Sequence, residues 1–124
     1  MKQMIIEATK NSPMVELNPE GIMIIQGRSI IEDTISFYNP IIDWVKQCSS
    51  KKFTLEVRLE YMNTSSSKQV FTILKTIKDN FSAKDVYIKW YYEEDDEDMF
   101  DTGKDFESLI RIPIDFYEYS DHAA

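Results

Sequence analysis

The sequence predicts a single α/β domain over residues 1–124, built on a mixed β-sheet of about five to six strands with helices packed on it. Three patterns in the middle of the chain indicate this class. Residues 53–61 alternate between apolar and polar, residues 70–81 carry apolar side chains at helical spacing, and residues 86–92 alternate again. A strand, a helix and a strand within about forty residues form a βαβ unit, whose strands should be parallel and joined by a right-handed crossover.

The N-terminal part of the chain predicts three strands. Residues 4–8 can form a short strand, and residues 14–17 and 22–26 flank the turn sequence Asn-Pro-Glu-Gly at 18–21. The two flanking runs therefore predict a hairpin. Because residues 22–26 are almost continuously apolar, we expect that strand to be covered on both faces.

A first helix should follow this hairpin. Ser29 and Glu32 have the spacing of a capping box, which predicts that the helix begins at Ser29. Apolar residues then recur at helical spacing straight through Pro40, so we expect a kink there and an end near residues 48–50.

The C-terminal part begins with an unbroken acidic run, residues 93–98. We expect a loop over this run that leads into a short helix. Alternating apolar residues then predict a last strand, formed by Ile110, Ile112, Ile114 and Phe116. Pro113 inside it indicates a position at the edge of the sheet.

The charge balance disfavours nucleic acids and anionic membranes as partners. The chain has 14 basic and 22 acidic residues, which gives a formal charge of −8. Binding to nucleic acids or to anionic membranes is disfavoured, because both need clustered Lys and Arg. Cys48 is the only cysteine, Glu7 interrupts the N-terminal apolar residues, and no apolar run is long enough for a membrane span. We therefore expect a cytoplasmic protein.

The candidate site lies where the central strand gives way to the second helix. Its residues are Tyr61, Met62, Asn63, Thr64, Ser65, Ser66, Ser67 and Lys68. Amide and hydroxyl side chains are preferred helix caps, and capping alone is one interpretation. Four consecutive hydroxyl residues exceed that need, however, and a helix N-terminus favours a phosphate, either from a ligand or attached covalently.

No catalytic machinery accompanies this turn. The chain lacks a Walker phosphate loop and a nucleophile elbow, and its only histidine, His122, lies next to the C-terminus. The acidic run lacks the spacing of an EF-hand, so a solvated loop or a docking surface for a basic partner competes with a cation site. Arg28 is a candidate docking residue, and Lys68 could contact a phosphate. We expect no enzyme activity, no metal and no cofactor.

Three blocks of the sequence resemble the SiaC family of bacterial regulatory phosphoproteins. The first runs from Gly27-Arg28-Ser29 through Glu32 and residues 37–40 to Trp44, the second is residues 59–68, and the third joins residues 90–92, the acidic run and Gly103. Ile31 departs from the family pattern, in which a proline is expected.

The resemblance implies a non-enzymatic switch. A serine/threonine kinase would phosphorylate Thr64, and a PPM-type phosphatase would reverse the modification. The unphosphorylated form would bind and activate a diguanylate cyclase, which raises cyclic di-GMP and promotes biofilm formation. The surface around Thr64, from Tyr61 to Lys68, would then be the partner surface.

Two other hypotheses remain open from the sequence. The fold is STAS-like by analogy, so the chain could act as an anti-sigma-antagonist type of module in a stress pathway or with another effector protein. Alternatively, a small-molecule or nucleotide-binding enzyme could use the hydroxyl turn as a phosphate cradle.

Overall fold

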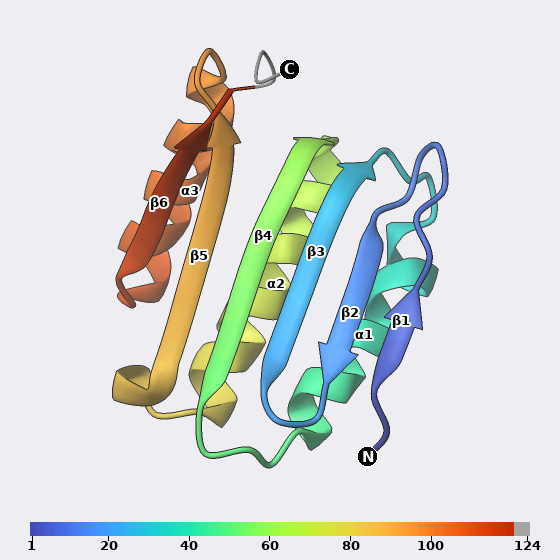
Figure 1. The fold of residues 1–124 in the computed structure, drawn as a ribbon, viewed down its shortest axis with the longest axis vertical. Helices are drawn as coiled ribbons and strands as arrows, with labels where there is room; N and C mark the ends of the chain where they lie inside the picture. The colour runs from blue at the N-terminus through green and yellow to red at the C-terminus, as the bar shows by residue number, and fades with distance from the viewer. Residues whose placement is uncertain (121–124) are drawn as a thin grey trace.

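The strands lie side by side in the same order as they occur in the chain, β1-β2-β3-β4-β5-β6 (Figure 1). The computed structural model describes residues 1–120. Its elements are β1 (Met4–Ile6), β2 (Met14–Asn18), β3 (Ile22–Ser29), α1 (Thr34–Gln47), β4 (Phe53–Met62), α2 (Thr64–Asn80), the 3-10 turn η1 (Ala83–Asp85), β5 (Val86–Glu93), α3 (Glu97–Ile110) and β6 (Ile114–Tyr119). The predicted α/β class with a six-stranded mixed sheet is confirmed.

The sheet has an antiparallel part and a parallel part. β1, β2 and β3 pair antiparallel, which confirms the predicted hairpin, whereas β3, β4, β5 and β6 pair in parallel. Each helix connects one parallel strand to the next, and every step goes in the same direction across the sheet. Right-handed crossovers then place all helices on one face, and Figure 1 shows α1, α2 and α3 together behind the sheet.

No helix within residues 1–120 covers the other face of the sheet, which corrects the prediction for residues 22–26. Met23 and Ile25 are fully buried on the helix side, whereas Ile22 and Ile24 are only half-buried on the open side. No crossover returns over that face, so the continuous apolar run is covered on one side only.

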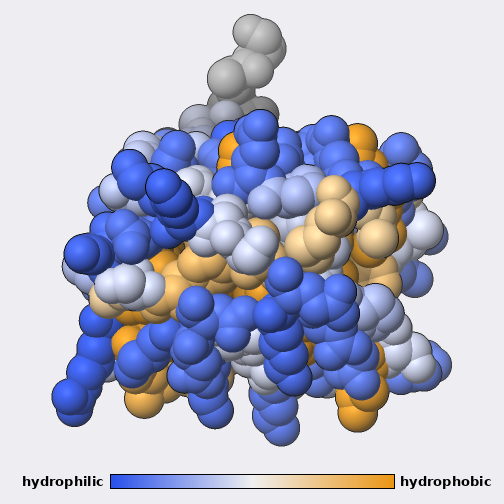
Figure 2. All heavy atoms as spheres, turned by 90° about the horizontal axis from the view of Figure 1, so that it is seen from below, coloured by the Kyte–Doolittle hydropathy of each residue, from blue (hydrophilic) through white to orange (hydrophobic). Residues whose placement is uncertain are grey.

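The hydrophobic core fills the space between the sheet and the helices. Seen from the end that is lowest in Figure 1, hydrophobic residues form a band across the middle of the molecule, with hydrophilic residues above and below it (Figure 2). The inward side chains of β4 are central to this core: Phe53, Leu55, Val57 and Leu59. Of the apolar residues at helical spacing in α1, Tyr38 and Val45 are buried, whereas Ile35 points outward and is 59% exposed.

The start of α1 differs from the prediction. The helix begins at Thr34, after Asp33, whose carboxylate accepts hydrogen bonds from the amide of Ser36 at 3.1 Å and from its hydroxyl at 2.7 Å. These bonds hold the pKa of Asp33 below its usual value. Ser29 ends β3 and is buried, so it cannot cap the helix. The helix does continue through Pro40 to Gln47 as predicted.

The third helix is longer than predicted. It begins at Glu97, inside the acidic run, after Asp96 has capped it by accepting from the amide of Met99 at 3.0 Å. It continues to Ile110, which therefore belongs to the helix and not to the last strand. β6 starts at Ile114, just after Pro113, and lies at the sheet edge as predicted.

A β-bulge disturbs the sheet next to the candidate site. The register of β3 and β4 shifts between Gly27 and Arg28, and Gly27 has a φ of 116°, which glycine adopts readily. The amide of Thr54 donates to the Gly21 carbonyl, just before β3, at 2.7 Å, and the amide of Asn63 donates to the Ser29 carbonyl at 3.0 Å. Both amides thus face the β3 side, although their positions differ by an odd number of residues. A regular strand points amides the same way only at even separations, so β4 contains one extra residue here.

The sheet opens between β4 and β5 beyond this bulge. Their pairing ends at Val57 and Trp90, whereas β4 continues beside β3 to Met62 and β5 continues beside β6 to Glu93. Figure 1 shows the two strands diverging toward their carboxyl ends. We call the space between residues 58–62 and residues 91–93 the split.

Candidate functional site

Asn63 joins β4 directly to α2 and fixes the start of the helix. Its side-chain oxygen accepts a hydrogen bond from the amide of Ser66 at 2.9 Å, which is the standard N-cap interaction. Its side-chain nitrogen donates to the carbonyl of Ile31 at 3.1 Å, and its amide donates to the carbonyl of Ser29 at 3.0 Å. The turn is therefore tied to the connection between β3 and α1.

Ser66 anchors the same turn in the core. Its hydroxyl accepts a hydrogen bond of 2.7 Å from Ser29, and the Ser29 and Tyr38 hydroxyls lie 2.7 Å apart. Since the single proton of Ser29 goes to Ser66, Tyr38 donates to Ser29. Burial raises the pKa of the Tyr38 hydroxyl, and its bond to Ser29 lowers it by less. Ser66 is thus a buried anchor and neither the helix cap nor an accessible phosphate acceptor.

Thr64 differs from its neighbours because its side chain is exposed and its hydroxyl makes no hydrogen bond within residues 1–120. It is the first residue of α2, and its hydroxyl has no hydrogen-bond partner within residues 1–120. The Ser65 hydroxyl, by contrast, donates to the Asn63 oxygen at 3.3 Å, and Ser67 is half-buried. Lys68 is exposed about one turn further along the helix. Among the four consecutive hydroxyls, Thr64 is the one most accessible to another protein.

Thr64 borders a hollow of about 340 Å³ on the helix side of the split. The ends of β4 and the starts of α2 and α3 surround it. It is lined by Tyr61, Met62, Asn63, Thr64, Ser67, Asp96, Asp98, Met99 and Thr102. These residues include two carboxylates but no Lys or Arg. The hollow was not predicted, because the sequence does not show that the acidic start of α3 faces the hydroxyl turn.

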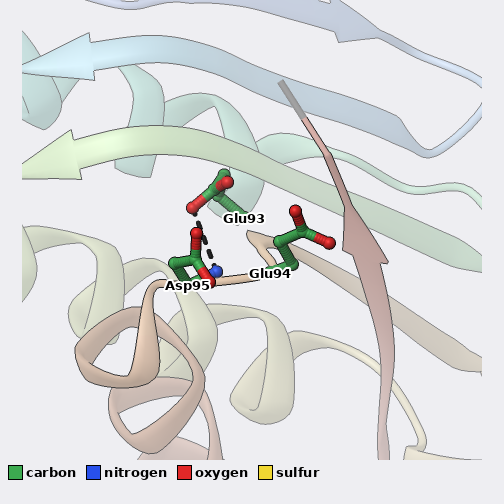
Figure 3. Close-up of side chains that lie close together, drawn as sticks. All are labelled: Glu93, Glu94 and Asp95. Carbon is green, nitrogen blue, oxygen red and sulfur yellow. Dashed lines mark hydrogen bonds between the residues drawn. The ribbon is translucent and has the colours of Figure 1, made fainter. Parts of the chain in front are cut away.

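The remainder of the acidic run lies at the end of β5 and in the turn after it. Figure 3 shows Glu93, Glu94 and Asp95 with their carboxylates grouped, and each offers one oxygen within 4.8 Å of the others. The amide of Asp95 donates to the Glu93 carboxylate at 3.1 Å. Glu94 and Asp95 are exposed, as acidic groups without a bound ion often are. The run is therefore a folded turn and helix start, and the absence of a metal stays a prediction.

Arg28 lies beside the turn but not in the hollow. It is exposed on β3, and its Cα is the register partner of Tyr61 on β4. Tyr61 is itself 51% exposed. The fold thus brings these two predicted residues together, whereas Lys68 projects from α2. His122 lies outside the described residues. None of the helices within residues 1–120 has the length and apolar character needed to cross a bilayer.

Comparison with known proteins decides the family. A sequence model described as the SiaC family of regulatory phosphoproteins matches residues 6–119. The chain belongs to the SiaC family. The predicted family is therefore confirmed, and the matched segment includes the whole of the hydroxyl turn and the split.

Members of the SiaC family share this fold in solved structures. The structure of SiaC of Pseudomonas aeruginosa superposes with a TM-score of 0.84 at 23% identity, over 96% of this chain and 100% of that one. SiaC in the crystal structure of the diguanylate cyclase SiaD with its activator SiaC gives 0.83 at 24% identity, over 94% and 99%. An uncharacterized protein of Pseudomonas aeruginosa strain UCBPP-PA14 is 25% identical over 119 residues, 92% of this chain and 94% of that protein.

Proposed function

We propose that this chain is a non-enzymatic regulatory phosphoprotein whose phosphorylation at Thr64 controls its binding to, and activation of, a diguanylate cyclase. Membership of the SiaC family supports a regulatory role for a phosphoprotein. A structurally similar SiaC is the activator in a complex with the cyclase SiaD, which supports the choice of partner. The proposed partners therefore include a serine/threonine kinase, a PPM-type phosphatase and the cyclase, acting in the cytoplasm.

The exposure of Thr64 is the observation that carries this proposal. Its hydroxyl is free and lies at the first position of α2, where the helix dipole favours negative charge. Because Asn63 caps the helix, modification of Thr64 removes no hydrogen bond on which the fold depends. A phosphate can therefore be added and removed without unfolding the turn.

The surroundings of Thr64 explain how a phosphate would change partner binding. The phosphate adds a charge of about −1.5 to −2 and three acceptor oxygens. It would enter a hollow that already contains Asp96 and Asp98, and no lining residue is a cation. The modification therefore alters both the charge and the shape of this surface. A partner packed on the unmodified hollow would meet a desolvation cost and a steric obstacle.

The test begins with the acceptor residue. The chain is incubated with its cognate kinase and ATP, and modified peptides are mapped by mass spectrometry. We expect phosphate on Thr64, none on Thr64→Ala, and unchanged modification of Ser65→Ala as the matched control. Modification confined to another residue would overturn the assignment.

The second part measures the effect on the cyclase. Unmodified protein and Thr64→Ala should stimulate cyclic di-GMP synthesis, whereas the phosphorylated protein and Thr64→Asp should bind the cyclase at least about tenfold more weakly, a loss of about 1.4 kcal/mol. Equal stimulation by the phosphorylated and unmodified forms would contradict the switch.

A further inference from the structure

The helix-free face of the sheet carries a column of stacked planar groups. Tyr91 on β5 and Tyr117 on β6 are register partners, and their rings stack at 5.0 Å with 21° between their planes. The guanidinium carbon of Arg58 lies 4.2 Å from the centre of the Tyr91 ring. Because β4, β5 and β6 are neighbours in that order, Arg58 and Tyr117 lie on opposite sides of Tyr91. The column therefore crosses three strands and ends at the guanidinium.

Hydrogen bonds hold the guanidinium at the end of this column. Its Nη2 group donates to the Glu56 carboxylate at 3.1 Å and to the Tyr91 hydroxyl at 3.3 Å. Within residues 1–120 the Nε and Nη1 groups of Arg58 make no hydrogen bond. The Arg58 side chain is 42% exposed, and Tyr91 covers only one face of its planar group. Arg58 is therefore fixed in place but keeps a second face for another molecule.

A hollow of about 340 Å³ begins beside Arg58 on this face of the sheet. Its lining residues are Gln26, Gly27, Arg58, Glu60, Tyr91 and Tyr119. Small-molecule sites have volumes of roughly 300 to 1,000 Å³, so the hollow suits a small ligand. Gln26 and Glu60 are exposed, and neither side chain makes a hydrogen bond or an ion pair within the described part of the chain. The hollow thus offers an amide and a carboxylate next to the planar end of the column.

The hydrogen-bonding groups of the hollow select one kind of planar ligand. The Glu60 carboxylate needs N–H donors, and guanine is the nucleobase with two of them side by side, on N1 and on the exocyclic N2. Adenine has an acceptor at N1, which a carboxylate repels. Guanine O6 accepts hydrogen bonds, and Gln26, the register partner of Arg58, has an amide that can donate one. Nucleobases also stack on guanidinium planes, so guanine would extend the column by one member.

We infer that this hollow binds a guanine base, carried by a nucleoside or a nucleotide, with the ring stacked on Arg58 and the N1 and N2 groups donating to Glu60. Among the lining residues the only cation is Arg58, which is already paired with Glu56. The sugar and any phosphate would therefore project into solvent. None of the lining residues belongs to the hollow beside Thr64, so the site does not depend on the proposed function.

Titration calorimetry of the unphosphorylated chain tests the choice of base. GMP and AMP differ only in the base, and we expect GMP to bind with a Kd below about 1 mM and AMP at least about tenfold more weakly. Cyclic di-GMP and cyclic di-AMP form a second pair, which distinguishes a mononucleotide from a dinucleotide as the ligand. If neither guanine ligand bound at about 1 mM, or if the guanine and adenine members of each pair bound equally, the inference would be wrong.

Matched substitutions test whether the base lies in this hollow. Glu60→Gln removes the carboxylate and nearly preserves the side-chain shape, so it should weaken the guanine ligand about tenfold and reduce the preference over its adenine counterpart. Asp115→Asn makes the same chemical change on an exposed residue of β6 outside the hollow, and both affinities should stay within about twofold. Arg58→Lys keeps the charge but removes the planar group, so it should weaken binding as well. All three variants should keep the thermal midpoint of the unmodified protein.

Amide chemical shifts provide an independent location for the ligand. During a titration with the tighter guanine ligand, the amides of residues 26–27 and 58–60 should shift most, and those of β1 should not move. Shifts confined to the helix side of the sheet would overturn the site. Equal effects of Glu60→Gln and Asp115→Asn on binding would overturn it too, because they would show that no carboxylate in the hollow contacts the base.

Discussion

The hydroxyl of Ser29 donates a hydrogen bond of 2.7 Å to the hydroxyl of Ser66, and both residues are fully buried. One residue ends β3 and the other lies in the first turn of α2. This contact places the exposed Thr64, two residues earlier, at a fixed position above a rigid base.

Replacing Ser66 by alanine should destabilise the protein. The buried Ser29 hydroxyl would lose its acceptor, and a buried donor without a partner costs about 1 to 3 kcal/mol. Urea unfolding of Ser66→Ala should show this loss in the free energy of unfolding. Ser65→Ala, in the same turn but less buried, is the control, and its change should stay below about 0.5 kcal/mol. Equal losses would mean that the buried hydroxyl chain adds no stability.

Asn63 makes two separable contributions to the turn. Asn63→Ala removes the cap to Ser66 and the bond to the Ile31 carbonyl, whereas Asn63→Asp keeps an acceptor for the cap. We expect loss of the cap to lower the free energy of unfolding by about 1 kcal/mol. Asn63→Asp should therefore be the more stable variant by thermal unfolding. The opposite ranking would show that a carboxylate oxygen placed against the Ile31 carbonyl costs more than the cap contributes.

Gly103 in α3 should not tolerate a methyl group. A Cβ atom there would lie 2.7 Å from Cε1 of Phe116 and 2.8 Å from Nε1 of Trp90. Because Trp90 is buried and donates to the Met99 carbonyl at 3.0 Å, its ring cannot move aside freely. Gly103→Ala should cost about 1 to 3 kcal/mol by chemical denaturation. Ser108→Ala, exposed on the same helix, tests whether helix propensity alone explains a change.

Tyr38 should make stability sensitive to alkaline pH. Its pKa is raised in the folded protein, so the unfolded chain loses the proton first. The contribution of Tyr38 is fully present below the ordinary value near 10 and is lost as the pH rises through the folded-state value. Between about pH 8 and 11, the midpoint temperature of thermal unfolding should fall less steeply for Tyr38→Phe than for the unmodified protein.

Parallel curves for these two proteins would contradict the prediction. Tyr87→Phe provides the control, because Tyr87 is exposed and belongs to no buried hydroxyl chain. Its pH dependence should follow that of the unmodified protein.

Patterns within one element were reliable guides to the fold. The alternation over β4 and the helical spacing over α2 predicted both elements and the junction between them, where Thr64 lies. A local pattern was a poor guide where the side chain bonds to residues far away in the sequence. Ser29 and Glu32 match a capping box locally, but the Ser29 hydroxyl is used by Tyr38 and Ser66, which only the fold brings near.

The third helix shows the same limit. The prediction was a loop over the acidic run that leads into a short helix, whereas α3 extends from Glu97 to Ile110 even though glycine lowers helix propensity. In the structure the glycine allows α3 to lie against Trp90 and Phe116, and packing outweighs propensity. The hollow next to Thr64 was missed because the sequence does not show that α3 starts inside the acidic run, with Asp96 and Asp98 next to the turn.

The order of the strands has a consequence for how the chain acquires its structure during synthesis. Each strand pairs with the one made just before it, so a growing chain never has to wait for a later segment to complete an earlier pair. Ser29, Tyr38 and Ser66 all leave the ribosome before β5, α3 and β6 do. The anchored turn that presents Thr64 can therefore assemble first, and the acidic wall of its hollow is added last.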